Sequence, residues 1–198
     1  MFDGVKGTYT EEDSPCPINE YGRQKAEAER GVLEADPRNL VLRTSGAYGW
    51  QWEPKNFVLQ VRKNLSEGKP MRVAEGLRYN PTYVENLAEI TASLVKAGAG
   101  GIYHVVGAEE IERAEFARRA ARAFGLDVKL IQTVSAGEFK SPTKRPKSSS
   151  LITEKVRRAV SPAPMGVSEG LRSMVAMEAK WAVYARTLPD PAAKVAPK

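Results

Sequence analysis

Apolar and polar residues follow two patterns along the chain, one with the period of a helix and one typical of short buried strands. Apolar positions with a helical period predict helices at residues 21–35, 56–65, 82–98, 111–124, 153–160 and 167–187. Short apolar runs bounded by turn-forming residues predict strands at residues 39–44, 71–74, 102–106 and 128–134. Because strands alternate with helices, the pattern indicates an α/β fold.

Local signals mark where several of these helices begin and end. Asp36-Pro37 ends the first helix, because the residue before a proline avoids helical geometry. The spacing of Thr82 and Glu85 predicts a capping box, and the helix that it opens is expected to bury one apolar face: Leu87, Ile90, Leu94 and Val95. The glycines within 98–101 follow a helix and precede a strand, which is the reverse of a dinucleotide-binding turn. We therefore interpret them as a helix stop.

Two loops are candidates for function. Residues 2–19 are rich in Gly, Pro, Asp and Thr and show no apolar period, which predicts a long ordered loop. Residues 45–49 contain two glycines and follow the strand predicted at 39–44. Ligands of open α/β sheets bind at such strand ends, so this second loop is a candidate ligand contact.

Length and composition exclude several classes of protein. A chain of 198 residues with 42% apolar residues can bury one substantial core. Its apolar runs are too short to span a bilayer, so we expect a cytoplasmic protein with no membrane partner. Cys16 is the only cysteine and His104 the only histidine, which excludes an internal disulfide, and no metal is expected. His104 lies in a predicted strand and is interpreted as a core histidine.

The formal net charge of +6 is unevenly distributed. Between residues 140 and 158 only Glu154 accompanies a run of basic residues: Lys140, Lys144, Arg145, Lys147, Lys155, Arg157 and Arg158. A solvated basic surface and a site for a small phosphorylated ligand both remain open as interpretations. No signature of a nucleic-acid-binding fold accompanies the charge, so no nucleic-acid partner is expected. Residues 188–198 are rich in Pro, Ala and Lys, which predicts a disordered tail.

One segment resembles a known family. The residues from Phe2 to Lys25, FDGVKGTYTEEDSPCPINEYGRQK, are similar to the active-site stretch of dTDP-4-dehydrorhamnose reductases, in which FDG, KG, Y, E, D, two prolines and N precede YGxxK. Further matches follow in the family's order: LRTS at 42–45, YG at 48–49, NFV at 56–58, PTYVENLA at 81–88, IYH at 102–104 and RPKSSSL at 145–151. The regulatory beta subunit of methionine adenosyltransferase, a non-catalytic relative, shares this pattern, so the resemblance leaves catalytic and regulatory roles open.

The resemblance implies the fold of an extended short-chain dehydrogenase/reductase, with the carboxy-terminal part of a Rossmann-type doubly wound sheet and a small substrate-binding α/β domain. Residues 1–50 are expected to end the Rossmann-type domain, with the YxxxK helix, and residues 51–187 to form mainly the substrate-binding part, with return segments to the sheet. The family's glycine-rich nucleotide fingerprint does not occur in this sequence. We therefore expect a truncated form that does not bind cofactor alone, with a separately encoded amino-terminal half or a homo-oligomer as partner.

Tyr21 and Lys25 are the candidate catalytic residues. They are four residues apart and therefore share one face of the predicted helix. In the reduction of a ketone, hydride reaches carbon and a proton must reach oxygen, so Tyr21 is the expected general acid, and the Lys25 ammonium assists proton exchange on its oxygen. The resemblance also implies that both contact the cofactor, NADPH or NADH. Ser45 is a weaker candidate for a contact near the nicotinamide.

Three residues are candidates for holding a nucleotide-sugar substrate. Asn56 resembles a sugar-nucleotide contact of extended short-chain reductases, and a plain helix cap explains it equally well. Arg145 and Lys147 lie in a proline-bounded loop and suit a diphosphate, with a solvated loop as the alternative.

The sugar itself is less well defined by the resemblance. The family often places Trp between LRTS and YG, where this chain has Gly46-Ala47, so Trp50 and Trp52 become the candidate rings for the sugar. The predicted function is NAD(P)H-dependent reduction of the 4-keto group of a nucleotide-linked 6-deoxy sugar. A non-catalytic regulatory subunit that resembles the methionine adenosyltransferase beta subunit is the alternative, and a fragment without independent activity is a third interpretation.

Overall fold

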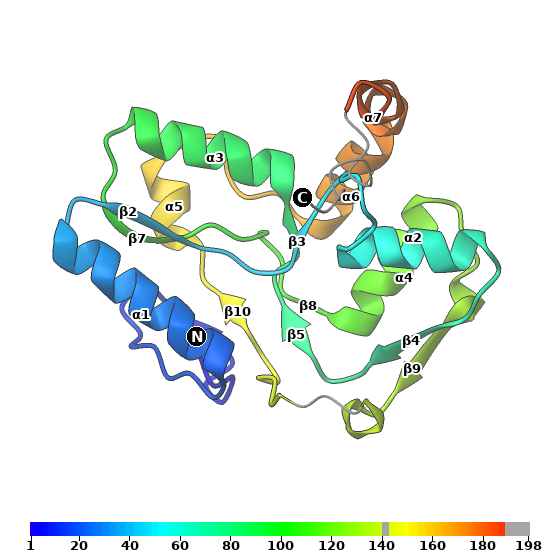
Figure 1. The fold of residues 1–198 in the computed structure, drawn as a ribbon, viewed down its shortest axis with the longest axis horizontal. Helices are drawn as coiled ribbons and strands as arrows, with labels where there is room; N and C mark the ends of the chain where they lie inside the picture. The colour runs from blue at the N-terminus through cyan, green and yellow to red at the C-terminus, as the bar shows by residue number, and fades with distance from the viewer. Residues whose placement is uncertain (140–142, 189–198) are drawn as a thin grey trace, which may run out of the picture.

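The computed structural model describes residues 1–139 and 143–188. Figure 1 shows two groups of helices and strands, joined through short strands in the middle of the view. Lys140 of the basic run and residues 189–198 of the predicted tail lie outside the described residues. Among the described helices, none is both long and apolar enough to cross a membrane.

The first group is built on a parallel pair of strands. β2 (Leu40–Arg43) pairs with β7 (Gly101–His104) along its whole length. Figure 1 shows α1 (Glu20–Ala35) on one side of this pair, and α3 (Val84–Lys96) and α5 (Glu154–Ala159) on the other. An apolar cluster holds α3 and α5 to the strands and is centred on four buried residues: Ile90, Leu94, Val105 and Val156.

A second parallel pair holds the amino-terminal loop. β1 (Thr8–Tyr9) pairs with β10 (Ser150–Leu151), which lies far away in the sequence. The ring of Phe2 stacks on that of Tyr9, with centroids 4.2 Å apart, and both rings are buried. The ordered loop predicted at residues 2–19 is therefore confirmed, with the short strand β1 within it.

The second group contains the larger core. β4 (Met71–Ala74) pairs in parallel with β9 (Ile131–Val134), and α2 (Phe57–Ser66) and α4 (Arg113–Ala123) pack on each other beside them. α6 (Val167–Ala176) lies against α4 and is followed by α7 (Glu178–Ala185). Two 3-10 turns complete this part of the chain: η1 (Val128–Leu130) and η2 (Ala136–Glu138).

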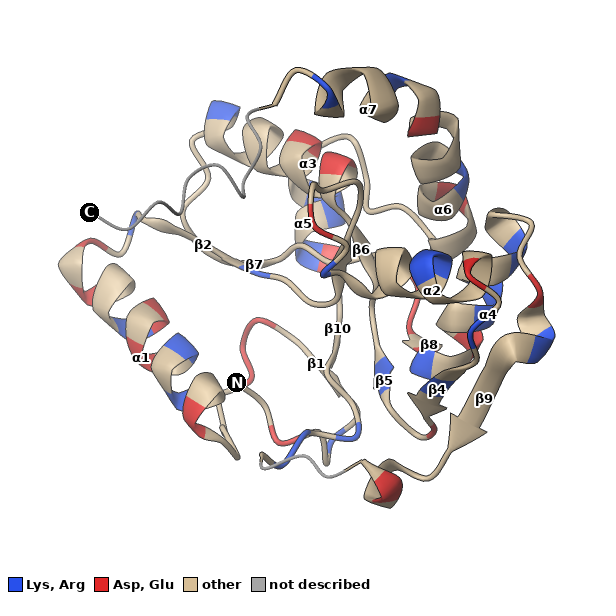
Figure 2. Cartoon of the chain, turned by 45° about the vertical axis from the view of Figure 1, so that its right-hand side comes forward, with Lys and Arg blue, Asp and Glu red and all other residues tan. Residues whose placement is uncertain are grey.

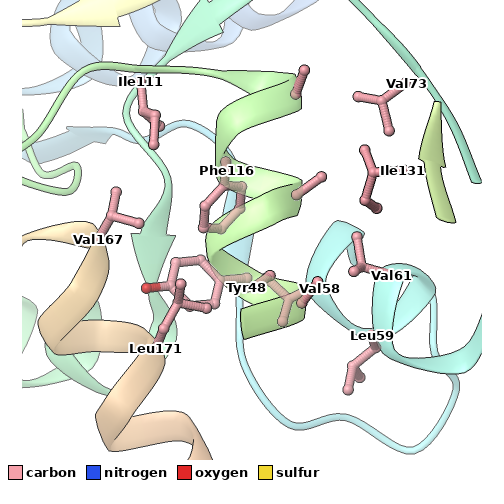
Figure 3. Close-up of a cluster of buried hydrophobic side chains, with 14 of the residues drawn as sticks. Tyr48, Val58, Leu59, Val61, Val73, Ile111, Phe116, Ile131, Val167 and Leu171 are labelled. Carbon is pink, nitrogen blue, oxygen red and sulfur yellow. The ribbon is translucent and has the colours of Figure 1, made fainter. Parts of the chain in front are cut away.

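Short strand pairs connect the two groups. β3 (Ala47–Tyr48) pairs in parallel with β6 (Thr82–Tyr83), and β5 (Arg78–Tyr79) pairs antiparallel with β8 (Ile111–Glu112). Figure 3 shows Phe116 of α4 among the side chains of this core. The Phe116 ring centroid lies 5.2 Å from that of Tyr48 and 5.8 Å from that of Phe57. Aromatic packing on α4 therefore fixes the position of the strand ends around it.

Most predicted elements are confirmed within one or two residues at their ends. The strand at 71–74 is reproduced without change, and the first helix ends at Asp36 as expected. Gly98 has a φ of +65°, and the Ala99 amide donates to the Leu94 carbonyl at 3.0 Å, so the interpretation of 98–101 as a helix stop is also confirmed. His104 is fully buried, as a core histidine should be.

Some predicted helix details are wrong. The predicted capping box does not form, because the Thr82 hydroxyl donates to the Ser45 carbonyl at 2.6 Å and the pairing of β3 with β6 places it there. Val95 is 64% exposed, since it lies one residue beyond Leu94 and so about 100° further around the helix. The helix predicted at 167–187 is interrupted at Met177, and the strand predicted at 128–134 begins with the turn η1.

Candidate functional site

Tyr21 and Lys25 lie together on α1, as predicted. The helix begins where the Asn19 side-chain oxygen accepts a hydrogen bond of 2.8 Å from the Gly22 amide. The Lys25 ammonium lies 5.6 Å from the centroid of the Tyr21 ring, and both side chains are exposed. The local sequence therefore presents a phenol and an ammonium side by side in the first turns of one helix.

These two side chains line a surface hollow of about 450 Å³ between α1 and β2. Leu42 and Thr44 line the same hollow from the strand side. Among the described residues, β2 has β7 as its single ladder partner. The Tyr21 hollow therefore lies along a strand that has one ladder partner in the described part of the chain.

A second hollow, of about 750 Å³, lies in the other group of elements and is lined by both apolar and cationic side chains. Phe57, Met71 and Val73 are among the apolar residues of its lining. The lining also contains four basic residues: Arg72, Arg113, Arg145 and Lys147. A pocket of this character suits a ligand with a flat ring and an anionic group.

Three of these four cations lack a carboxylate partner among the described residues. Within residues 1–139 and 143–188, the ion pairs do not involve Arg113, Arg145 or Lys147, whereas Arg72 pairs with Glu138. The Arg113 guanidinium lies 3.9 Å from the centroid of the Phe57 ring. Burial lowers the pKa of Arg113, and the nearby charge of Arg145 acts in the same direction. A partly buried cation beside a like charge is stabilised by a bound anion.

The loop that carries Arg145 and Lys147 is fixed by backbone hydrogen bonds to β5. The Arg78 amide donates to the Lys147 carbonyl at 2.9 Å, and the Ser149 amide donates to the Arg78 carbonyl at 3.0 Å. Figure 2 shows basic residues of this part of the chain beside the amino-terminal loop. The sequence run RPK is therefore held at a defined place in the fold, although both cationic side chains are exposed.

Two contacts join the cationic loop to the amino-terminal part of the chain, one at the start of α1 and one within the amino-terminal loop. The Asn19 side-chain nitrogen donates to the Lys144 carbonyl at 2.9 Å, while its oxygen caps α1. Gly4 has a φ of +80°, and a Cβ at this position would lie 2.6 Å from the Ser148 carbonyl oxygen and 2.8 Å from Cβ of Pro146. Asn19 therefore joins the predicted catalytic helix to the predicted diphosphate loop, and Gly4 lets the amino-terminal loop pack closely on the same segment.

Ser45 and Asn56 lie outside both hollows. The Ser45 carbonyl accepts the Thr82 hydroxyl, and Thr44 lines the Tyr21 hollow in place of Ser45. The Asn56 amide is used on both sides, because its oxygen caps α2 at the Leu59 amide and its nitrogen donates to the Gly49 carbonyl at 2.8 Å. The helix-cap interpretation of Asn56 is confirmed, and its contact with a sugar nucleotide stays a prediction, as does the role of Ser45.

The candidate tryptophan rings lie elsewhere. Trp50 donates its indole N–H to the Met174 carbonyl at 2.7 Å and lines, with Trp52 and Trp181, a separate hollow of about 390 Å³. At Gly46, a Cβ would lie 2.4 Å from the Tyr79 ring, so that ring fills the space of a side chain at this position. The structure therefore does not bring Trp50 or Trp52 into the hollows of Tyr21 or Arg145.

Arg113 and Thr44 are not among the candidates that the sequence patterns predict. Arg113 is the first residue of α4, and the strand β8 just before it directs its side chain toward the cationic loop. The helical pattern does not predict this direction of the Arg113 side chain, because it places residues 111 and 112 within the helix and not in a strand. Within the described residues, no group of three or more His, Cys, Asp or Glu side chains is arranged to hold a metal ion.

Comparison with known proteins gives a consistent family. A family model described as the RmlD substrate binding domain matches residues 1–179. A dTDP-4-dehydrorhamnose reductase of Sinorhizobium fredii is 30% identical over 170 residues, which cover 80% of this chain and 56% of that protein. Methionine adenosyltransferase 2 subunit beta of Rattus norvegicus is 28% identical over 182 residues, which cover 86% of this chain and 54% of that protein.

Solved structures give the same picture. A crystal structure of dTDP-4-dehydrorhamnose reductase from Bacillus anthracis, in complex with NADP, superposes with a TM-score of 0.81 at 28% identity, covering 88% of this chain and 62% of that chain. This similarity confirms the predicted α/β fold of Rossmann type. The chain spans about half the length of the curated relatives it matches.

Proposed function

This chain belongs to the RmlD substrate binding domain family, and we propose that it supplies the catalytic pair and the substrate site of an NADPH- or NADH-dependent reductase. The proposed substrate is a nucleotide-linked 4-keto-6-deoxy sugar. The observation that carries the proposal is the junction made by Asn19, which caps the helix of Tyr21 and Lys25 and also binds the cationic loop of Arg145. One folded unit thus combines a proton donor with anion-binding groups.

The cationic hollow supports the choice of a nucleotide diphosphate. Arg145 can donate two parallel hydrogen bonds to phosphate oxygens, and Lys147 adds a point charge on the same loop. Arg113 adds a third cation without a carboxylate partner among the described residues, above the Phe57 ring. The apolar side chains in the lining of the hollow offer a surface for a base or a sugar face. A solvated basic loop would account for Arg145 and Lys147 taken separately. It does not account for the presence of a third cation, Arg113, in the lining of the same hollow.

The residues of the Tyr21 hollow fit the cofactor that the family implies. Tyr21 and Lys25 expose a phenol and an ammonium to one hollow, and both groups can donate hydrogen bonds to ribose hydroxyl oxygens. A bound dihydronicotinamide would supply the hydride for carbon 4 of the sugar. Tyr21 would then donate its phenolic proton to the ketone oxygen, which becomes the hydroxyl, and Tyr21 would regain a proton from water at its exposed edge.

The partner that we propose is a second polypeptide or a second copy that pairs with β2. The chain spans about half of its relatives, and β2 has one ladder partner within the described residues. A parallel strand added to β2 would extend the sheet in the manner of strand addition. Co-purification with the amino-terminal half of a relative would support a second polypeptide as the partner. Sedimentation of the chain alone as a dimer would support a second copy.

We further propose that the protein works in the cytoplasm.

The function is tested by direct reduction. Purified protein, alone and mixed with the amino-terminal half of a relative, is incubated with NADPH or NADH and dTDP-4-keto-6-deoxy sugar, and loss of absorbance of the reduced nicotinamide is followed. We expect turnover in at least one of these mixtures and a rate about 10²- to 10⁴-fold lower with Tyr21→Phe. Equal turnover by wild type and Tyr21→Phe would reject the reductase mechanism.

A regulatory subunit is the second candidate, because the similarity to methionine adenosyltransferase 2 subunit beta covers 86% of this chain. It predicts binding to a methionine adenosyltransferase without reduction of a sugar. Size-exclusion chromatography of the chain mixed with that enzyme tests it: co-elution together with an absence of turnover would favour this function over the reductase.

A further inference from the structure

The helix that carries Tyr21 and Lys25 has little apolar anchorage. α1 extends over 16 residues, and only Gly22 and Glu29 of these are buried. A surface helix is usually fixed by an apolar stripe that faces the core. The anchorage of α1 therefore rests on its amino-terminal cap, on the close packing at Gly22 and on the one buried charged side chain that it contributes, Glu29.

Glu29 lies on the same face as Tyr21 and Lys25, four residues beyond Lys25. Its carboxylate accepts two hydrogen bonds from Arg43 of β2, from Nε at 2.8 Å and from Nη2 at 2.6 Å. The two side chains are 7% and 5% exposed. A bidentate pair of this kind has one preferred orientation, so it fixes the rotation of α1 about its own axis relative to the strand.

Arg43 is in turn held by the single histidine. Its Nη1 lies 3.2 Å from Nε2 of His104, and Nδ1 of His104 lies 3.2 Å from the Ile152 carbonyl oxygen. A guanidinium can only donate, so Nε2 must accept and Nδ1 must carry the proton that is donated to Ile152. His104 is therefore neutral and in one tautomer, in agreement with the lowering of its pKa by burial.

The other groups around this cluster connect it to the amino-terminal loop. The Glu11 carboxylate accepts from the His104 backbone amide at 2.9 Å, and its second oxygen lies 3.9 Å from Nδ1. The Arg43 guanidinium faces the Phe2 ring, 5.2 Å from its centroid. The polar partners of Arg43 thus come from two different elements, Glu29 from α1 and His104 from β7, and both are buried.

Stability alone is a weak explanation for such a buried ion pair. Replacement of buried ion pairs by apolar residues is often neutral or stabilising, because the cost of desolvating both charges is large. What an apolar replacement cannot supply is the directional geometry of a bidentate contact. We propose that Glu29 is a positioning residue, which acts through Arg43 and neutral His104 to set the direction in which Tyr21 and Lys25 face their hollow.

This inference rests on the proposed function for the chemistry of Tyr21, and its first test needs no cofactor. The variant Glu29→Gln keeps the size of the side chain and removes its charge. Glu27→Gln is the matched control, since Glu27 is exposed on the same helix. Nuclear magnetic resonance on nitrogen-15-labelled protein reports the tautomer of His104 without overlap, because the chain has one histidine.

In wild type and Glu27→Gln we expect one neutral His104 tautomer with the proton on Nδ1. In Glu29→Gln we expect a changed His104 signal and faster hydrogen exchange along α1. Unchanged spectra and exchange in Glu29→Gln would overturn the proposal, whether or not the protein reduces a sugar.

The second test separates positioning from folding. The double variant Glu29→Met with Arg43→Met removes both charges of the pair together, so its melting temperature should lie closer to that of wild type than the melting temperature of Glu29→Gln, in which Arg43 is left unpaired. Its kcat should stay on the order of 10- to 100-fold below wild type, with KM for the nucleotide sugar nearly unchanged. Recovery of kcat together with the melting temperature would overturn the positioning role. Absence of turnover in wild type would instead reject the proposed function, and the cofactor-free spectra would still decide the role of Glu29.

Discussion

The Lys25 ammonium lies 5.6 Å from the centre of the Tyr21 ring, one turn along the same helix. If Tyr21 is the general acid, Tyr21→Phe should lower kcat by about 10²- to 10⁴-fold and leave KM for the nucleotide sugar nearly unchanged. Steady-state kinetics with NADPH measure both constants. Tyr184→Phe is the matched control, because Tyr184 is also exposed and lies on α7. A similar loss in both variants would point to folding and not to catalysis.

The cationic hollow should bind a nucleoside diphosphate through Arg113 and Arg145, which have no carboxylate partner within residues 1–139 and 143–188. Arg145→Ala and Arg113→Ala should each lower the affinity for dTDP by about 10- to 100-fold, the value of one hydrogen bond to a charged group. Isothermal titration calorimetry measures the change. Arg38→Ala provides the control, since Arg38 is exposed and pairs with Asp36, outside this hollow. Equal dTDP affinity in all the variants would leave the loop as a solvated surface.

Two glycines should respond in opposite directions to substitution by alanine. A Cβ at Gly107 would lie 2.0 Å from the Pro81 carbonyl oxygen, so Gly107→Ala should destabilise the fold by about 1–3 kcal/mol or more. At Gly31, within α1, a Cβ has no atom within 4 Å, so Gly31→Ala should stabilise by about 0.5–1 kcal/mol. Urea unfolding measures both effects. A stable Gly107→Ala protein would mean that the chain near Pro81 can move.

Buried His104 should make stability depend on pH. Burial and the Arg43 charge hold its pKa below the ordinary value of 6.5. As the pH falls below about 6.5, the unfolded chain therefore takes up a proton before the folded protein does, and stability declines toward the lower folded pKa. Denaturation at pH 7 and pH 5 should show this decline in wild type and a smaller one in His104→Gln.

Asp13 should make stability depend on pH in a more acidic range than His104 does. Its hydrogen bonds with Lys6 and Thr10 lower its pKa to about 2, so its contribution is present above pH 3.8 and declines below that value. The effects of His104 and Asp13 on stability therefore fall in different pH ranges and can be measured separately. If the loss of stability between pH 7 and pH 5 is the same in His104→Gln as in wild type, groups other than His104 are responsible for it.

The sequence predicted the elements whose signals are local. The strand at 71–74 follows a Gly-Lys-Pro break, and its predicted bounds agree with those of β4. Asp36-Pro37 predicts the end of α1 at the position where the structure has it. Thr82 shows the limit of such local signals. Its hydroxyl donates to the distant Ser45 carbonyl, and the two local hydrogen bonds of the predicted capping box do not form. The YxxxK spacing placed Tyr21 and Lys25 on one face for the same local reason.

The rest of the candidate site depends on contacts between distant segments. Arg113 reaches the hollow of Arg145 because β8 pairs with β5, and β5 also binds the loop at Lys147. Likewise, Glu29 and Arg43 are separated by 14 positions, and nothing in either local pattern marks them as partners. These relationships come from tertiary packing, which single-sequence periodicity does not encode.

Asn19 uses both ends of one amide, with its oxygen on the Gly22 amide and its nitrogen on the Lys144 carbonyl. Deamidation, a common form of protein ageing, would replace that nitrogen with a second acceptor oxygen. The resulting carboxylate would still cap the helix and would interact favourably with the helix dipole. The same carboxylate would repel the Lys144 carbonyl oxygen, however. Ageing of this single side chain would therefore strengthen α1 and at the same time detach the cationic loop from it.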